Sequence, residues 1–579
     1  MVNPLQFVAR PWSQQPDRTA RRRIVPVPDD TPSTDAIFLA LRRMRTPIIL
    51  IIAIFTISVI GLVLIPGVDE QGRPYRMSVF DAFYFISYTA TTIGFGETPH
   101  AFTIPQRMWT TLSIYASVVG WAYGIGAMFS LIQNQTFQDA VSTQRFARRV
   151  RRLREPFWIL AGYGQTGARV ADELDAEDVR FVVIDHDHTR IDALADGHLV
   201  EDVPAIDGDA SRPGVLGIAG LGHPHCAGVL ALTDDDHANL AIAMAANLLR
   251  PEVPVYARCE DRRIEDKLHC FGVEGVINPN DRFGGYLVLA LQRPVTHRLV
   301  TWLMSQVGTP LPEGRREPSS GRWVVTAEGQ FGREVAHDLG AAGLQVERVL
   351  PEAGLPEDIG DAEGFVAGLD RDTSNLALAE HARLANPEIM LVVRQSYRDS
   401  DPLVTALGVN VVYMASDLVA REVLARIITP VFRGFIDVAL EKPDEWSGAL
   451  LERIVEVCGD RNPEREVVHL TPETAPAASR WLEEGHRLTV RDLFRDADDR
   501  DLRLQAMALV LRRDNQVVCV PTEDTELQLG DELLVVGRPR ALGEMEPVLD
   551  YDATVEYAVT GQKVPTGSLW RALVGRRGA

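Results

Sequence analysis

Cysteine is scarce in this chain of 579 residues, and its spacing excludes disulfide frameworks and zinc sites. Both kinds of site need cysteines in close, repeated spacing. The chain has five cysteines and none forms a Cys-x-x-Cys pair: Cys226, Cys259, Cys270, Cys458 and Cys519. We therefore expect neither kind of site, and we assign no metal-ligating residue.

Positive charge is also in short supply. The chain has 59 lysines and arginines against 80 aspartates and glutamates, which gives a formal net charge of −21 at pH 7. Many arginines gather beside two apolar runs, so the acidity belongs to the rest of the chain. Because nucleic-acid-binding surfaces are basic, we expect no nucleic-acid partner.

Two apolar runs are long enough to cross a bilayer. Pro47 to Ile65 is an uncharged, mostly apolar stretch of 19 residues, and Met108 to Ile132 is a second run. A spanning helix needs about 20 such residues. Between them, Val79 to Tyr88 is apolar and aromatic but too short to span, which suits a re-entrant helix buried in protein. The remainder is long enough for three or four soluble domains.

The segment between the runs reads Thr89-Ala90-Thr91-Thr92-Ile93-Gly94-Phe95-Gly96-Glu97. It resembles the selectivity filter of the potassium-channel family, whose common pattern is Thr-x-Thr-Thr-Val-Gly-Tyr-Gly-Asp. Rings of backbone carbonyls replace the water around an ion, and glycine allows the left-handed conformations that aim successive carbonyls at one axis. Span, half-helix, filter and span form the pore module of this family. The resemblance assigns the filter, with K⁺ as the permeant ion, to Thr91, Thr92, Ile93, Gly94, Phe95, Gly96 and Glu97.

Three filter residues depart from the family pattern. Ile93 replaces valine, Phe95 lacks the tyrosine hydroxyl that could brace the filter, and Glu97 replaces aspartate at the outer mouth. The carbonyls survive all three changes, whereas the stiffness of the filter, and with it the strictness of ion selection, depends on the side chains that differ. A weakly selective cation channel therefore stays open as an alternative.

The arginines predict the orientation in the membrane. Eight precede the first run, six follow the second between residues 145 and 154, and three lie between the runs. The positive-inside rule places both termini in the cytoplasm and the filter loop outside. The first 46 residues are too polar and too long for a signal peptide, and about the first 35 are expected to be disordered. We expect a multi-pass protein of the cell (inner) membrane, in contact with the lipid bilayer.

The family resemblance also implies an assembly and a mode of gating. A carbonyl stack needs rotational symmetry, so one chain supplies a quarter of a homotetrameric pore. Neither apolar run carries the arginine ladder of a voltage sensor, so gating is expected to come from the cytoplasmic part. In the second run, Gly120 and Gly124 could form a gating hinge or could pack closely against the first span. The residues leave both alternatives open.

A glycine loop opens the cytoplasmic part. Phe157 to Ala161 is strand-like, Gly162-Tyr163-Gly164-Gln165-Thr166-Gly167 precedes a helical pattern, and the next strand ends at Asp185. Gly-x-Gly-x-x-Gly in this context predicts a dinucleotide-binding fold. The helix start offers N–H groups to a phosphate, and Asp185 can accept hydrogen bonds from both hydroxyls of an adenosine ribose. NADP is disfavoured because its 2′-phosphate would meet the negative charge of Asp185. The alternative is a structural glycine turn in a Rossmann-like fold that binds no nucleotide.

Acidic residues follow two further strand-like segments of this part of the chain. Gly208-Asp209-Ala210 and Thr233 to Asn239, together with the glycine loop, resemble the N-terminal lobe of the RCK domain, which regulates potassium conductance. The resemblance adds Asp209 to the nucleotide-binding residues. It implies NAD(H) or another adenine nucleotide as ligand and leaves Ca²⁺ open. The acids at 234–236 could instead form a solvated loop.

The chain then repeats itself at a fixed offset of 136 residues. Residues 232–243 align with 368–379, and matches at this offset continue to Pro294 and Pro430, which indicates a duplication. The second copy is shorter in its middle and lacks a Gly-Asp-Ala equivalent. Ala327 stands where Gly162 would be and Leu350 where Asp185 would be, so we expect the second copy to be mainly structural.

The expected fold class is a membrane α-helical pore module, followed by tandem α/β Rossmann-like N-lobes and a small α/β C-terminal lobe. The turn and alternating strand of Leu527 to Gly537 resemble the C-terminal lobe of RCK proteins. The expected division is 1–46 N-terminal segment; 47–136 pore module, with spans 47–65 and 107–133, pore helix 79–90 and filter 91–97; 137–156 linker; 157–320 first N-lobe; 321–462 second N-lobe; 463–547 C-terminal lobe; 548–579 tail.

These features predict a ligand-gated potassium channel with a cytoplasmic RCK ring. A membrane-tethered NAD-dependent oxidoreductase is a rival reading of the glycine loop. It would need a catalytic His, Lys or Tyr near a nicotinamide, and no such constellation stands out, so we assign no catalytic residue and expect no enzyme. A regulatory part of an ion transporter is disfavoured because the chain holds a complete pore module.

Overall fold

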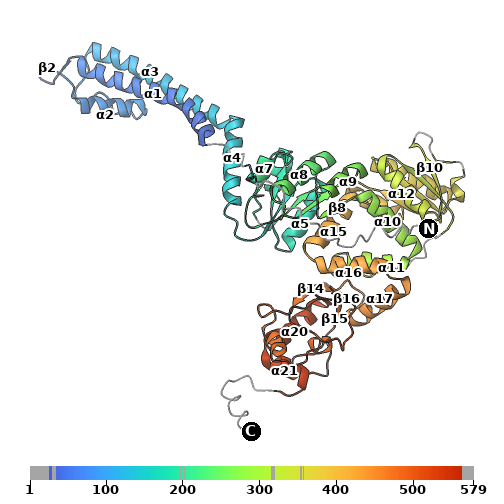
Figure 1. Ribbon diagram of the computed structural model, residues 1–579. Helices are drawn as coiled ribbons and strands as arrows, with labels where there is room; N and C mark the ends of the chain where they lie inside the picture. The colour runs from blue at the N-terminus through green and yellow to red at the C-terminus, as the bar shows by residue number, and fades with distance from the viewer. Residues whose placement is uncertain are drawn as a thin grey trace, which may run out of the picture.

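A narrow helical arm and a larger α/β body make up the molecule (Figure 1). The computed structural model describes residues 25–28 and 34–563, apart from 196, 198, 201, 315–319, 352–354, 357 and 515. Most of the segment expected to be disordered, and the end of the chain from 564, lie outside the described residues.

The arm holds two helices long and apolar enough to cross a membrane. These are α1 (Thr34–Leu64), in which Met44–Leu64 qualifies, and α3 (Ile104–Ile132). The short helix α2 (Val79–Ala90) lies between them in the sequence and packs against both. Strands β1 (Gly67–Val68) and β2 (Pro74–Tyr75) form an antiparallel pair. Helix α1 starts well before the expected span because the polar stretch ahead of Pro47 continues the same helix.

The connection between arm and body is a helix rather than the expected linker over 137–156. Helix α4 (Gln135–Val150) starts at Asn134, whose side chain accepts a hydrogen bond from a backbone N–H of the first turn. Near its other end, Phe146 and Val150 are buried in the core of the first lobe. Apolar anchoring of this kind makes the connection rigid at its body end.

The first lobe is a doubly wound parallel sheet. Its strand order, β5-β4-β3-β6-β7-β8, reverses direction between β3 and β6, where ligands bind in folds of this type. The strands are β3 (Phe157–Ala161), β4 (Arg180–Asp185), β5 (Ala205–Asp207), β6 (Cys226–Ala231), β7 (Val255–Arg258) and β8 (Gly275–Ile277). The helices are α5 (Gln165–Ala176), α6 (His188–Ala195), α7 (Pro213–Ile218), α8 (Asp236–Leu249) and α9 (Arg262–Cys270).

The second lobe repeats this sheet in a shorter form, with strand order β10-β9-β11-β12-β13. In the part of the chain that the structure describes, this sheet has no counterpart of β5, as the shorter middle of the second copy predicts. Its strands are β9 (Arg322–Ala327), β10 (Gln345–Val349), β11 (Gly364–Gly368), β12 (Met390–Arg394) and β13 (Val411–Tyr413). Its helices are α12 (Gly329–Ala341), α13 (Asp372–Ala385) and α14 (Asp401–Ala406), with 3-10 turns η4 (Ile359–Asp361) and η5 (Arg398–Ser400).

The duplication is visible in individual hydrogen bonds. The Asn239 amide nitrogen donates to the carbonyl oxygens of Thr233 and Arg258. The Asn375 amide nitrogen donates in the same way to Leu369 and Arg394. Every partner is displaced by the offset of 136 residues, so the two lobes share a detailed architecture.

In each lobe, a helix after the last strand packs against the other lobe. Helix α10 (Pro279–Gln292) of the first lobe packs on α12, and α15 (Ala415–Ile427) of the second lobe packs on α5. The short helices α11 (Pro294–Leu303) and α16 (Pro430–Glu441) follow them and contact each other. The helix behind each glycine loop therefore lies against the opposite lobe.

A four-stranded antiparallel sheet forms the C-terminal lobe, in the order β14-β17-β15-β16. One face packs on α11, α16 and α17 (Asp444–Cys458), and the other on helices α18 to α21. The strands are β14 (Glu464–His469), β15 (Ala506–Arg513), β16 (Gln516–Cys519) and β17 (Glu532–Gly537); the helices are α18 (Pro476–Glu483), α19 (Val490–Leu493), α20 (Pro539–Asp550) and α21 (Asp552–Thr560).

The expected tail from 548 is wrong in its first part. Helix α20 continues past that position, and Val555 and Ala558 of α21 are buried in the core of the C-terminal lobe. No motif marks this segment in the sequence, because contacts with distant parts of the lobe hold it in place.

Candidate functional site

The filter segment follows directly on α2 and has an alternating backbone. Thr92, Gly94 and Gly96 have φ values of 64°, 68° and 92°, in the left-handed region. Ile93 and Phe95 between them do not. A Cβ added at Gly94 or Gly96 would meet no atom within 4 Å in this chain. The backbone conformation, rather than lack of space, is therefore what favours glycine at both positions.

A tyrosine of α2 braces this segment. The Tyr88 hydroxyl donates to the Gly96 carbonyl oxygen at 2.6 Å and lies 2.8 Å from the Thr98 hydroxyl. The Tyr88 ring is buried and meets the Phe95 ring edge-on, with centroids 5.3 Å apart. Tyr88 thus supplies a brace from the half-helix where Phe95 has no hydroxyl. Sequence reasoning missed it because only the fold brings Tyr88 to the filter.

The carboxylate at the outer mouth is held by an arginine. Arg107 Nε and Nη2 donate to the two Glu97 carboxylate oxygens at 2.7 and 3.0 Å, and the Phe102 N–H donates to Glu97 at 2.8 Å. These donors, Arg107 first, lower the pKa of Glu97. Glu97 therefore ties the filter to the start of α3. The sequence had placed Arg107 only as a charge between the spans.

The glycines of α3 face the neighbouring helix. A Cβ at Gly120 would lie 2.9 Å from Ile54 Cδ1, and one at Gly124 would lie 2.9 Å from Ile51 Cδ1. Both positions therefore let α1 approach closely, which favours the packing role over the hinge. The hinge role stays an untested prediction.

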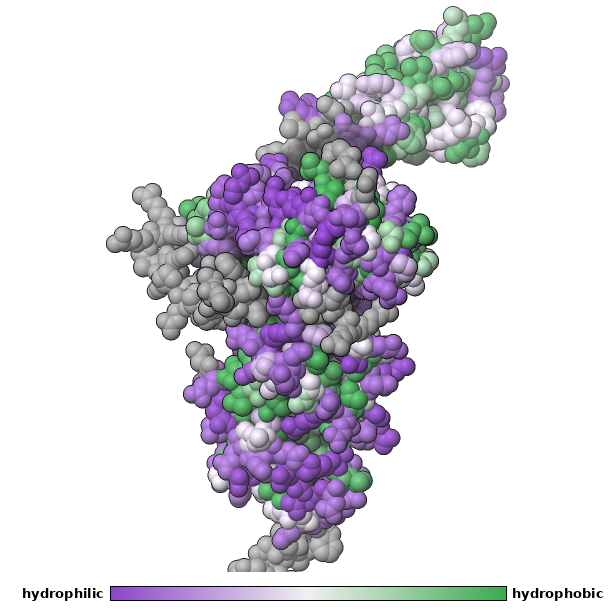
Figure 2. All heavy atoms as spheres, turned by 90° about the vertical axis from the view of Figure 1, so that its right-hand side faces the viewer, coloured by the Kyte–Doolittle hydropathy of each residue, from purple (hydrophilic) through white to green (hydrophobic). Residues whose placement is uncertain are grey.

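The outer surface of the arm is apolar. Figure 2 shows hydrophobic residues over much of the arm and mainly hydrophilic residues on the body. Ile52, Ile60, Leu112 and Val119 are among the exposed apolar side chains of α1 and α3. A patch of this extent on one part of a protein marks a surface that is covered by lipid or by other chains.

The glycine loop joins β3 to α5 in the first lobe. A Cβ at Gly162 would lie 2.8 Å from Thr233 N, and one at Gly167 would lie 1.9 Å from the Gly162 oxygen, so these two glycines serve backbone packing. At Gly164 the nearest atom would be Arg190 Nη1 at 3.4 Å, the tip of a flexible side chain. Gly164 also caps α5 without a side-chain hydrogen bond. The N–H groups that follow it, of Gln165 onward, can therefore meet an anion.

Asp185 differs from its expected arrangement. It ends β4, and its side chain is 1% exposed. One carboxylate oxygen accepts a hydrogen bond from the Tyr163 N–H at 2.5 Å, and the other accepts one from the Asp187 N–H at 2.8 Å. Arg190 Nη1 lies 3.4 Å from it. Asp185 thus holds the glycine loop in shape, and the sequence did not reveal Arg190 as its neighbour.

The other expected acids have local roles in this structure. Asp209 accepts hydrogen bonds from the backbone and hydroxyl of Ser211. Asp235 caps α8, and Asp236 accepts two backbone N–H groups of the loop after β7. Within the described residues, no group of three or more His, Cys, Asp or Glu side chains is placed to hold a metal ion.

The corresponding loop of the second lobe packs against a buried aromatic ring. Phe331, which aligns with Thr166, is 2% exposed and stacks on Tyr413 with ring centroids 4.6 Å apart. A Cβ at Gly368 would lie 2.3 Å from the Phe331 ring. Leu350, directly after β10, is 70% exposed. An aromatic ring thus occupies the space beside the loop, which favours the structural role expected for this copy.

Two family models match the chain. Residues 48–134 match the ion channel family, and residues 158–279 match the TrkA-N domain.

Relatives include potassium channel protein 1 of Methanocaldococcus jannaschii, 27% identical over 240 residues that cover 41% of this chain and 67% of that one. An uncharacterized protein of Methanothermus fervidus is 25% identical over 248 residues, which cover 42% of this chain and 38% of that one. The match thus spans little more than a third of the second relative's length.

Among solved structures, the GsuK channel bound to NAD has a TM-score of 0.41 and 13% identity, covering 89% of this chain and 99% of that one. By the two family matches, the chain combines an ion channel module with a TrkA-N domain, and together with the similarity to a potassium channel these matches support a two-span potassium channel with RCK domains.

Proposed function

We propose that this protein is a potassium channel whose opening is controlled by an adenine nucleotide bound to its first lobe. The observation that carries the proposal is the left-handed backbone at Thr92, Gly94 and Gly96, set between a half-helix and a spanning helix. A backbone of this kind can present successive carbonyl oxygens to a dehydrated cation. Similarity to the ion channel family and to a named potassium channel supports K⁺ as that cation.

The pore is a homotetramer in this proposal. The Ile93 and Phe95 side chains are 61% and 65% exposed on a single chain, and rings of filter carbonyls need several copies around one axis. Four chains supply eight N-lobes, enough for a closed ring beneath the pore. The arginine distribution supports a protein of the inner membrane with both termini and the ring in the cytoplasm.

The nucleotide site is the glycine loop of the first lobe. Gly164 and the start of α5 receive a phosphate, and Arg190 is the nearest cation to that position. Asp185 exchanges one of its backbone hydrogen bonds for the ribose hydroxyls. NAD(H) or another adenine nucleotide is the ligand, and Ca²⁺ is the second effector to titrate alongside it.

The proposed gating depends on the contact between the helix after the glycine loop and the second lobe. Helix α5 lies against α15 of the second lobe, so a nucleotide that moves the loop also changes the angle between the lobes. Helix α4, anchored through Phe146 and Val150, transmits that change to α3. The nucleotide controls the pore to the extent that it binds one ring state more tightly than the other.

Reversal potentials of the purified full-length protein in planar bilayers test the central claim. In a K⁺/Na⁺ gradient we expect the potential to follow the K⁺ gradient. Gly94→Ala should abolish current or selectivity, because a Cβ resists the left-handed backbone by about 1–2 kcal/mol in each subunit. A reversal potential near zero for the unaltered protein would instead establish the weakly selective cation channel.

A further inference from the structure

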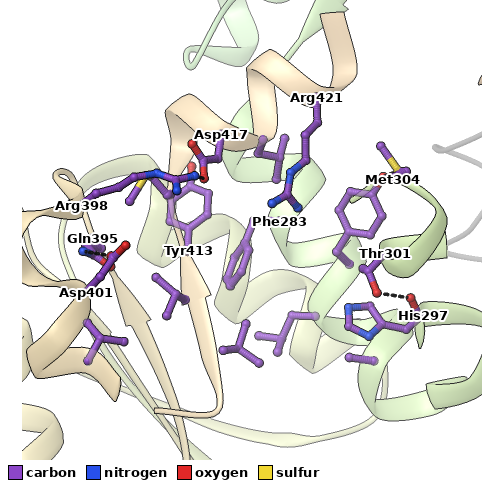
Figure 3. Close-up of a pocket in the computed structure, with 18 of the residues that line it drawn as sticks. Phe283, His297, Thr301, Met304, Gln395, Arg398, Asp401, Tyr413, Asp417 and Arg421 are labelled. Carbon is purple, nitrogen blue, oxygen red and sulfur yellow. Dashed lines mark hydrogen bonds and ion pairs between the residues drawn. The ribbon is translucent and has the colours of Figure 1, made fainter. Parts of the chain in front are cut away.

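A cavity of about 450 Å³ lies between the two lobes, away from the glycine loop. One wall comes from α10 and α11 of the first lobe, and the other from Gln395, directly after β12, and from η5, α14, β13 and α15 of the second lobe (Figure 3). None of the glycine-loop residues 162–167 lines it. The volume falls within the range of about 300–1,000 Å³ that is usual for small-molecule sites.

The floor of the cavity is apolar and aromatic. Phe283 and Tyr413 meet there with ring centroids 4.5 Å apart, and Leu287, Ala290 and Val404 complete the surface. Burial lowers the pKa of His297, at the far side, to about 4, so its imidazole is neutral at physiological pH. A flat, uncharged ring is the kind of group that this floor accommodates.

One buried acceptor in the cavity wall has no donor. Gln395 is 3% exposed, and its amide nitrogen donates to the Tyr397 carbonyl oxygen and to Asp401 Oδ1, at 2.5 and 2.8 Å. Its Oε1 atom is buried and has no hydrogen-bond partner in the described part of the chain. Buried acceptors are nearly always paired, so this atom calls for an N–H or O–H donor.

One cation at the cavity is also uncommitted. Arg421 of α15 is exposed and extends toward Phe283 (Figure 3). Across the described residues, no hydrogen bond or ion pair joins it to an acid. The neighbouring Arg398, by contrast, is paired with Asp417. The free positive charge therefore lies at the mouth of the cavity.

The duplication shows that these two groups are not part of the shared scaffold. At the offset of 136, the position of Gln395 corresponds to Cys259 in the first lobe, and that of Arg421 corresponds to Gly285. Neither counterpart carries an amide acceptor or a charge. The pair is thus specific to this side of the lobe junction.

We propose that the cavity binds a planar aromatic ring that carries one N–H donor and one anionic group. The ring packs on Phe283 and Leu287, the N–H donates to Gln395 Oε1, and the anion pairs with Arg421. Because the walls belong to different lobes, an occupant favours one lobe arrangement over others. The cavity is then a second effector site, independent of the nucleotide site.

Calorimetry on the full-length protein in lipid nanodiscs tests this with three probes. Indole-3-carboxylate has both groups, 1-methylindole-3-carboxylate lacks the N–H, and indole lacks the anion. We expect the first to bind and each of the others to bind at least about tenfold more weakly, the loss usual for one charge-assisted or buried hydrogen bond. Equal affinities for the three, or no binding of indole-3-carboxylate up to about 1 mM, would overturn the assignment.

Variants locate the site. Ala290→Leu adds three carbon atoms to the floor where the ring packs, so it should weaken binding about tenfold or more, and Arg421→Gln should weaken it by a similar factor. The control is Arg371→Gln, which removes an exposed arginine of the same lobe away from the cavity. Size-exclusion elution checks that each variant assembles. Undiminished binding by an assembled Ala290→Leu protein refutes the proposal, and no result here depends on whether the glycine loop binds a nucleotide.

Discussion

At the scale of single residues, the filter depends on a hydroxyl outside its own motif. Tyr88→Phe deletes the hydrogen bond to the Gly96 carbonyl oxygen and keeps the buried ring. A hydrogen bond of this kind is worth about 1 kcal/mol, repeated in each subunit. We expect reversal potentials to show a lower preference for K⁺ over Na⁺, while current persists.

Tyr84→Phe is the matched control for this change. Tyr84 lies one turn earlier on α2 and is 50% exposed. The Tyr84→Phe channel should keep the K⁺ over Na⁺ selectivity of the unaltered channel. Equal potentials for Tyr88→Phe and the unaltered channel would mean that the brace does not govern selection.

A second residue-scale prediction separates the two lobes. Asp185→Leu removes a carboxylate that shapes the glycine loop and that we assign to the ribose. Calorimetry with NAD should show affinity lower by one to two decades, since hydrogen bonds to charged groups are worth about 1.5–3 kcal/mol. Leu350→Asp, at the exposed counterpart, should leave the affinity near its original value. An unchanged affinity for Asp185→Leu would place the nucleotide elsewhere.

At the scale of elements, the contact between α10 and α12 gathers like charges. Asp338 of α12 lies over Gly284 of α10, close to Asp281 and Glu334, and Arg262 faces these acids. Burial first, and then the two acids, raise the pKa of Asp338 from 3.8 to about 7. Between about pH 4 and pH 7, the folded state therefore keeps a proton on Asp338 that the unfolded chain has released.

The sign of the pH effect follows from that difference. Stability from this group is complete below about pH 4 and is lost as the pH rises through about 7. Thermal melting should show a falling melting temperature from pH 5 to pH 8, and Asp338→Asn should flatten that part of the profile. A variant profile parallel to the original would contradict the raised pKa.

The elements also show what the sequence could reveal. Motifs carried by neighbouring residues were predictable, such as the half-helix with its filter, the glycine loop and the repeat at an offset of 136. Features that join distant segments were not: the Glu97–Arg107 pair, the acids around Asp338 and the burial of α21. Helix α4 was not predicted from the sequence, because it is polar on its exposed side and has no long apolar pattern. It is anchored by the core of the first lobe.

At the scale of the whole molecule, a buried carboxylate lies at the junction of the lobes and is bonded across it. Glu422 of α15 is 1% exposed, pairs with Arg433 at 2.9 Å and Arg426 at 3.5 Å, and accepts a hydrogen bond from the Tyr286 hydroxyl of α10 at 3.2 Å. Burial acts to raise the pKa of Glu422, but the nearby arginines, led by Arg433, outweigh it and hold that pKa well below its usual range. Breaking a buried pair from one side leaves an uncompensated charge.

Glu422→Gln should therefore loosen the lobe junction without touching the filter. We expect a lower melting temperature, in line with a loss of about 3–5 kcal/mol, and a weaker response of open probability to nucleotide. The reversal potential should not change, since the filter lies in the arm. Glu441→Gln, at an exposed position of α16, serves as the control. If Glu422→Gln keeps both the melting temperature and the nucleotide response, the lobes do not communicate through this junction, and α4 must receive its signal from the first lobe alone.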